Sequence, residues 1–128
     1  MNILIAEDND INRILIKKIF SKTGLDFDIA TNGQEALKAF ENKYYDLVFM
    51  DIEMPLMDGF EVTRNLREKY KDKPVQPYIV ALTANSLSGE KKRCIEMGMN
   101  DYLSKPFSVE DVQSMIDRAL EFSSVDEN

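Results

Sequence analysis

The chain has 128 residues, of which 44% are hydrophobic and 30% charged, and its formal net charge is −7. This length and hydrophobic content fit one compact domain, and the negative charge argues against DNA as a direct partner, because binding to phosphate backbones depends on Lys and Arg. The sequence contains no histidine, which excludes a Ser-His-Asp triad, a histidine-ligated zinc site and a phosphohistidine within this chain.

Apolar runs alternate along the chain with segments whose apolar residues recur at helical spacing. Gly24 and Gly98 end two of the helical segments. The pattern predicts strands at residues 2–6, 26–30, 46–50, 78–83 and 101–104, and helices at residues 10–22, 33–41, 57–70, 86–97 and 109–122. We therefore expect one domain over residues 1–122, followed at 123–128 by a flexible tail or the start of a linker.

This strict alternation of strands and helices is typical of an α/β fold with a doubly wound, five-stranded parallel sheet and five helices. Right-handed crossovers then place helices on both faces of the sheet. In such sheets, ligands bind outside the carboxyl ends of the strands. Functional residues are therefore expected directly after the strands.

Polar side chains do follow the strands. Glu7 and Asp8 come after the first strand, Asp51 after the third, Thr83 ends the fourth, and Lys105 follows the fifth. Gathered carboxylates repel by about 4 kcal/mol per close pair at an effective dielectric constant near 20, unless a cation lies among them. All-oxygen ligands at an incomplete site favour Mg²⁺, whose coordination phosphate oxygens complete. The pattern thus indicates phosphate chemistry with Mg²⁺ as cofactor.

Each of these residues has a distinct expected role. Asp51 is the candidate nucleophile, since a carboxylate can attack phosphorus and form an acyl phosphate. Lys105 is expected to balance the phosphate charge, and the Thr83 hydroxyl to hydrogen-bond a phosphoryl oxygen. The segment MDIEMPLMDG predicts a tight loop that offers the backbone carbonyl of Glu53 to the metal.

Four motifs stand at the strand ends: Glu7-Asp8, Asp51 before MPLMDG, Thr83-Ala84, and Lys105-Pro106-Phe107. Together they resemble the response-regulator receiver family, and the resemblance covers nearly the whole chain, from residue 2 to residue 122. It implies a flavodoxin-like receiver fold with sheet order 2-1-3-4-5. It also implies that Asp51 is phosphorylated, with self-phosphorylation and self-dephosphorylation as the domain's own activities.

The resemblance also assigns the metal ligands and the switch. Asp8 contacts Mg²⁺ directly and Glu7 helps through water, although Glu7 departs from the commoner aspartate at this position. The peptide before Pro106 is implied to be cis. The aromatic ring of Tyr102 turns inward when Thr83 moves onto the phosphate, which makes a two-state switch.

The segments EDNDINRILI, VALTAN and GMNDYLSKPF are similar to receivers of hybrid sensor histidine kinases. The phosphohistidine donor must then lie on a kinase dimerisation domain or a histidine phosphotransfer protein. The isolated Cys94 and the short apolar runs favour a cytoplasmic location, on the cytoplasmic side of the membrane for a sensor kinase. A stand-alone response regulator and a receiver-like scaffold that is not phosphorylated are the alternatives.

Two other classes fit the residues less well. A phosphohydrolase with an aspartyl intermediate needs a second aspartate two residues after the nucleophile, where Glu53 stands. A flavin-binding module needs a loop rich in Ser, Thr and Gly after the first strand, and EDND would repel the flavin phosphate.

The first predicted helix has an apolar face formed by Leu15, Ile16, Ile19 and Phe20. Ile11 and Ile14 lie off this face, and they either face a partner or pack against the edge of the sheet. Family membership further implies that Glu53 and Asn85 tune the rate of phosphoryl hydrolysis.

Overall fold

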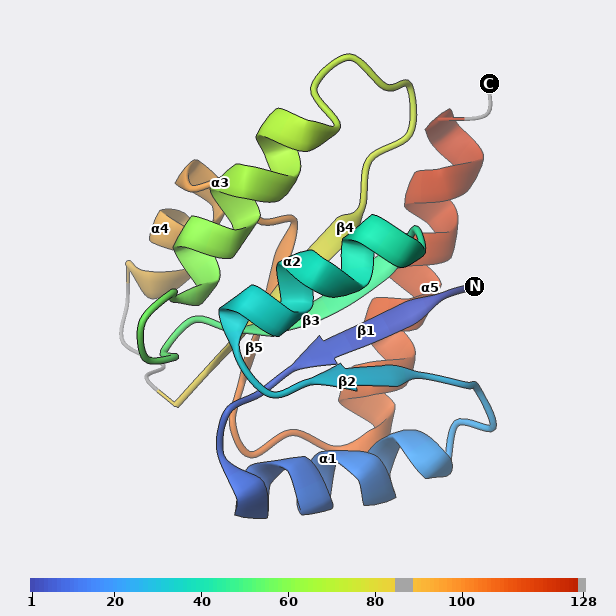
Figure 1. Cartoon of the computed structure of the whole chain (residues 1–128). Coiled ribbons are helices and arrows are strands. Elements are labelled where there is room, and N and C mark those ends of the chain that lie inside the picture. Colours follow the sequence, from blue (N-terminus) through green and yellow to red (C-terminus); the bar gives the residue numbers. More distant parts are fainter. Residues whose placement is uncertain (85–88, 127–128) are drawn as a thin grey trace.

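The computed structural model describes residues 1–84 and 89–126, which fold into a parallel sheet between two layers of helices (Figure 1). The strands are β1 (Ile3–Ala6), β2 (Asp28–Ala30), β3 (Leu47–Asp51), β4 (Tyr78–Thr83) and β5 (Asp101–Ser104), in the spatial order β2-β1-β3-β4-β5. The helices are α1 (Asp10–Ser21), α2 (Gly33–Asn42), α3 (Gly59–Lys69), α4 (Glu90–Glu96) and α5 (Val109–Asp126). The predicted fold class and sheet order are confirmed.

Two apolar cores cover the two faces of the sheet. Successive side chains of a strand point to opposite faces, so Leu4 and Val48 pack with α2, α3 and α4, whereas Ile3 and Phe49 pack with α1 and α5. The central strands β1, β3 and β4 are fully buried, as their continuous apolar sequences predict. Among the described residues, no helix is long and apolar enough to span a bilayer.

The predicted element boundaries differ from the structure at several points. Helix α3 begins at Gly59 and not at residue 57, because the Asp58 side chain caps the helix by accepting a hydrogen bond from the Glu61 amide. Helix α5 continues to Asp126, so the predicted tail at 123–128 starts inside a helix. The predicted start of the fourth helix, at residue 86, lies outside the described residues.

The interpretation of the first helix was wrong for one residue. Leu15 was placed on the buried face, but its side chain is 52% exposed. The stripe that packs on the sheet consists of Ile16 and Phe20, one helical turn apart, with Ile19 partly buried at its margin.

Candidate functional site

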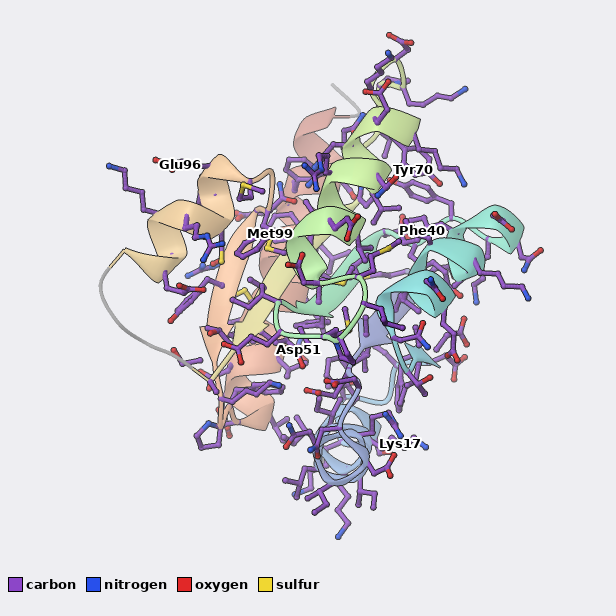
Figure 2. The ribbon with its side chains drawn as sticks, turned by 60° about the vertical axis from the view of Figure 1, so that its left-hand side comes forward. Lys17, Phe40, Asp51, Tyr70, Glu96 and Met99 are labelled. Carbon is purple, nitrogen blue, oxygen red and sulfur yellow. The ribbon has the colours of Figure 1, made fainter. Side chains whose placement is uncertain are left out.

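The register of the sheet brings Glu7 next to Asp51. Ala6 pairs with Met50 in the parallel ladder between β1 and β3, so the next positions along these strands are Glu7 and Asp51. Ala6 and Met50 belong to the core on the face of α2, α3 and α4, so the alternation of side chains directs Glu7 and Asp51 toward the face covered by α1 and α5. Figure 2 labels Asp51 at this carboxyl edge of the sheet.

Three carboxylates converge at this edge. Glu7, Asp8 and Asp51 each offer one oxygen within 4.8 Å of the oxygens of the other two. Glu7 is fully buried and Asp51 is 4% exposed. A cavity of about 220 Å³ opens here, lined by Glu7, Asp8, Asn9, Asn12, Asp51, Glu53, Ala84 and Lys105. The structure therefore brings together the acidic residues that the sequence predicted, with the predicted lysine beside them.

Lys105 supplies the one positive charge among the residues that line this cavity in the described structure. Its Nζ donates a hydrogen bond to Glu7 Oε1 at 2.5 Å and lies 3.4 Å from Asp51 Oδ2. The Lys105 backbone amide donates to the carbonyl of Thr83 at 2.7 Å, and the following peptide bond to Pro106 is cis, as the resemblance implied. In this state the lysine is therefore bound more closely to the glutamate than to the candidate nucleophile.

The pKa values of the two buried carboxyl groups are shifted in opposite directions. Burial, followed by the hydrogen bond with Glu7, raises the pKa of Asp51 to about 7. Burial also acts to raise the pKa of Glu7, but its hydrogen bonds with Asp51 and Lys105 outweigh it and lower that pKa below the usual value. Near neutral pH, Glu7 therefore carries the negative charge while Asp51 is close to its own midpoint.

The donor set fits a divalent metal ion. Its side-chain ligands are carboxylate oxygens only, which suits Mg²⁺ and not a soft metal. Lys105 is the one ammonium among the described residues that line the cavity, so the three carboxylates keep excess negative charge; a proton on Asp51 reduces this excess, and a divalent cation would balance it. The raised pKa of Asp51 thus marks a place where a cation is electrostatically favoured.

The loop after β3 is held close to the nucleophile. The Glu53 amide donates to Asp51 Oδ1 at 3.0 Å, and Glu53 lines the cavity, while metal binding by its backbone carbonyl stays a prediction. At Gly59 the chain passes so near that a Cβ atom would lie 2.5 Å from the carbonyl oxygen of Asp51. Only glycine permits this close return of α3 to the end of the strand.

Thr83 and Tyr102 lie on the opposite face of the sheet from Lys105. Thr83 is fully buried, and among the described residues of β4 and its following segment Ala84 lines the cavity in its place. Tyr102 pairs with Ala81 along the ladder and packs into the core beneath α2, α3 and α4. The two predicted switch residues thus share the face toward α4, and the predicted tuning residue Asn85 lies outside the described residues.

The structure adds three residues at the beginning of α1 to the site: the capping residue Asn9, and Asn12 and Arg13 of the helix. The Asn9 side chain caps α1 by accepting a hydrogen bond from the Asn12 amide at 2.9 Å. The Asn9 amide also donates to Glu7 Oε2 at 3.2 Å, while Asn12 lines the cavity. Arg13 donates to the Glu7 carbonyl at 3.0 Å. The sequence signal for these residues was that Asn12 and Arg13 follow Asn9 by one helical turn, and that the first turn of α1 directly follows the acidic pair.

An exposed apolar surface on α1 lies beside the site. Ile11, Ile14 and Leu15 are 69%, 56% and 52% exposed, so the hypothesis that Ile11 and Ile14 pack against the sheet edge is wrong. A second cavity of about 540 Å³ separates α1 from the segment after β5. Asn12, Ala84 and Lys105 line both cavities, so the two lie next to each other.

The chain matches known signalling proteins over most of its length. Residues 3–117 match the family model "Response regulator receiver domain". The chain is 42% identical over 126 residues to hybrid signal transduction histidine kinase K of Dictyostelium discoideum, covering 94% of this chain and 10% of that protein. It is 40% identical over 116 residues to the aerobic respiration control sensor protein ArcB of Escherichia coli, covering 91% of this chain and 15% of that protein. The chain thus spans a small part of these curated relatives.

Solved structures agree with this assignment. The receiver domain of sensor histidine kinase PA1611 from Pseudomonas aeruginosa, with a magnesium ion coordinated in its active-site cleft, has a TM-score of 0.82 and 35% identity, with 94% and 97% of the two chains covered. A Saccharomyces cerevisiae complex of the phosphotransfer protein Ypd1 with the Ssk1 receiver domain has a TM-score of 0.81 and 31% identity, with 88% and 83% covered. The chain therefore belongs to the response regulator receiver domain family of two-component and phosphorelay systems, and it is homologous to the receivers of hybrid histidine kinases.

Proposed function

We propose that Asp51 accepts a phosphoryl group from a phosphohistidine, with Mg²⁺ held by Glu7, Asp8, Asp51 and the carbonyl of Glu53. The observation that carries this proposal is the position of Asp51. It is a nearly buried carboxylate at the end of a central strand, inside an acidic cluster and beside an ammonium group. A turn residue or a simple surface carboxylate would not be held in this way.

The transfer needs only a few groups. Asp51 Oδ2, which faces the ammonium of Lys105, attacks phosphorus, while the bond from phosphorus to the imidazole nitrogen of the donor breaks and its electron pair stays on the imidazole. The Glu53 amide keeps the other oxygen, Oδ1, in place through its hydrogen bond. Hydrolysis of the resulting acyl phosphate by water returns the free carboxylate and inorganic phosphate.

Charge compensation is divided between the metal and the lysine. When bound, Mg²⁺ holds Asp51 in its ionised form and neutralises charge on the phosphoryl oxygens. Lys105 moves from Glu7 toward the new phosphoryl group, because the phosphoryl oxygens then offer its ammonium group a stronger negative charge. The 2.5 Å contact between Lys105 Nζ and Glu7 Oε1 supports this role, because the ammonium group already reaches the buried carboxylate of the site.

The signal leaves the site through Thr83 and Tyr102. The Thr83 hydroxyl hydrogen-bonds the phosphoryl group after transfer, and Tyr102 takes the space that the threonine vacates. Their shared position on the face toward α4 supports this coupling. The output surface is therefore proposed on the α4 side of the domain.

The donor is proposed to dock on α1. Ile11, Ile14 and Leu15 are exposed on α1, and Leu15 lines a groove that adjoins the site. This arrangement favours a partner with an apolar helical surface and a phosphohistidine. A kinase dimerisation domain or a histidine phosphotransfer protein has this chemistry. The complex of Ypd1 with a receiver domain supports the second kind of partner.

The parent protein is proposed to be a hybrid sensor histidine kinase. The support comes from the identity to hybrid kinases and sensor proteins, of which this chain matches only a short part. The domain would then act on the cytoplasmic side of the membrane, where the ATP-dependent kinase generates the phosphohistidine. Glu53 and Asn85 are proposed to set the lifetime of the acyl phosphate.

Phosphorylation by acetyl phosphate tests the function. Wild type, Asp51→Asn and Asp26→Asn are incubated with and without Mg²⁺, and intact mass is read for one added phosphoryl group. Asp26 is exposed and far from the cluster in sequence, so its variant is the matched control. We expect wild type and Asp26→Asn to gain the group only with Mg²⁺, and Asp51→Asn to gain none. Labelling of Asp51→Asn, or no labelling of wild type, would overturn the proposal.

A second experiment tests the docking surface. Ile14→Glu should leave labelling by acetyl phosphate unchanged, because Ile14 lies outside both cavities, and it should slow transfer from a phosphorylated histidine phosphotransfer protein. Equal transfer rates for the variant and wild type would rule out this surface as the donor's binding site.

A further inference from the structure

Arg13 is turned back from α1 toward the segment that carries the acidic pair. Its side chain is 18% exposed although it belongs to the first turns of a surface helix. One nitrogen, Nη1, donates to the backbone carbonyl of Glu7 at 3.0 Å, and the other, Nη2, pairs with the carboxylate of Asp10. The guanidinium thus bridges the beginning of α1 and the end of β1.

The carbonyl that Arg13 binds belongs to the peptide between the two candidate ligands. Because this peptide is a rigid plane, the orientation of its carbonyl oxygen also sets the position of the Asp8 amide and Cα atom. The other side of Glu7 is held by its amide, which donates to the Ala30 carbonyl at 3.1 Å. With both backbone groups of Glu7 bonded, the turn from β1 into the acidic pair is fixed.

Asp8 depends on this backbone more than Glu7 does. The Glu7 carboxylate has contacts of its own, with Lys105 Nζ through Oε1 and with the Asn9 amide through Oε2. For the Asp8 carboxylate the described residues provide no hydrogen bond or ion pair, and it is only partly buried. Its position near the other two carboxylates therefore rests on the peptide that Arg13 holds.

We infer that Arg13 is a positioning residue for the acidic pair, which keeps Asp8 aimed into the cluster and so raises the affinity of the site for Mg²⁺. This inference rests on the proposed function, and it concerns a side chain that does not itself contact the metal or the phosphoryl group. A charge effect would act in the opposite direction, because a cation near the cluster repels Mg²⁺. The sign of the change on removing Arg13 therefore separates positioning from simple electrostatics.

Calorimetric titration with Mg²⁺ alone, at fixed ionic strength, tests the inference. Arg13→Met removes the donors and the charge, Arg13→Lys keeps the charge, and Lys17→Met removes a positive charge from an exposed position one turn further along α1 (Figure 2). We expect Arg13→Met to bind Mg²⁺ about tenfold more weakly, which corresponds to about 1.4 kcal/mol, and Arg13→Lys about threefold more weakly. Lys17→Met should stay within about twofold of wild type.

Labelling by acetyl phosphate gives an independent readout. In Arg13→Met, the Mg²⁺ concentration for half-maximal rate should rise by about the same factor as the dissociation constant, while the rate at saturating Mg²⁺ stays within about twofold of wild type. Thermal unfolding without metal shows whether each variant is folded, and Arg13→Lys keeps the test open if Arg13→Met is not.

Two results would overturn the inference. One is equal or tighter Mg²⁺ binding by folded Arg13→Met, or by Arg13→Lys if only that variant folds. The other is wild type that binds no Mg²⁺, which also removes the proposed function. If wild type binds Mg²⁺ and is labelled, and the Arg13 variants bind Mg²⁺ as tightly as wild type, only the positioning role fails.

Discussion

The raised pKa of Asp51 predicts how the stability of the metal-free domain depends on pH. Folding raises this pKa from 3.8 to about 7, chiefly by burial and then by the neighbouring Glu7. Between these two values the folded protein holds a proton that the unfolded chain has released. The free energy of unfolding must therefore fall as the pH rises through this window. Asp51→Asn removes the titrating group while keeping nearly the same shape.

The expected size follows from the shift. Each pH unit well inside the window lowers the free energy of unfolding by about 1.4 kcal/mol, and the slope falls to half at the folded pKa, so the loss between pH 5 and pH 7 is about 2 kcal/mol and levels off above pH 7. Glu7 acts in the opposite sense, because its pKa lies below the ordinary 4.5. Its contribution is lost only as the pH falls below that value, which is outside the range from pH 5 to pH 8 used for the measurement.

Urea unfolding of wild type and Asp51→Asn at pH 5, 6, 7 and 8 without divalent metal measures the effect. Residues that titrate equally in both proteins cancel in the difference. The variant should gain about 2 kcal/mol relative to wild type between pH 5 and pH 7, and saturating Mg²⁺ should remove most of this difference by stabilising ionised Asp51. A difference that stays within about 0.5 kcal/mol across the range would show that Asp51 is ionised in the folded protein, which would refute the electrostatic reasoning.

Three further predictions concern neighbours of Asp51. Lys105→Met should destabilise the metal-free protein by about 3 kcal/mol, because it leaves buried Glu7 without its ammonium partner, and Mg²⁺ should raise the melting temperature of this variant more than that of wild type. Gly59→Ala should cost about 2 kcal/mol in urea unfolding, since its Cβ would meet the backbone of β3. Asp58→Ala should cost about 1 kcal/mol through loss of the α3 cap while leaving the extent of labelling by acetyl phosphate unchanged, and a larger loss of labelling would contradict a purely capping role.

The fold was predictable because each element is bounded by strong local signals. The central strands are short continuous apolar runs, and a parallel sheet buried on both faces selects such runs. Asp51 was predictable as a site residue for the same reason, since a carboxylate directly after such a strand lies at the edge of the sheet where ligands bind. The position of Glu7 beside Asp51 follows from the pairing of β1 with β3 alone.

The contacts inside the site were not predictable from the sequence. The pairing of Lys105 with Glu7 depends on the length of the glutamate side chain and on the relative positions of β1 and β5, which no local pattern encodes. Leu15 was misplaced for a related reason. Helical spacing defines a broad apolar stripe, but the packing of α1 on the sheet decides which edge of the stripe is covered, and that edge is Ile16 and Phe20.

The charges of the site support the proposed switching by one phosphoryl group. Glu7, Asp8 and ionised Asp51 bring three negative charges, and Lys105 with a divalent metal ion brings three positive ones. The site proposed for the metal-bound state is therefore electrically balanced. Converting Asp51 to an acyl phosphate replaces one negative charge by about two, which leaves an excess in a nearly buried place. That excess favours a new hydrogen-bond donor, and we propose Thr83, which ends the adjacent strand β4 one position beyond Leu82, the register partner of Asp51.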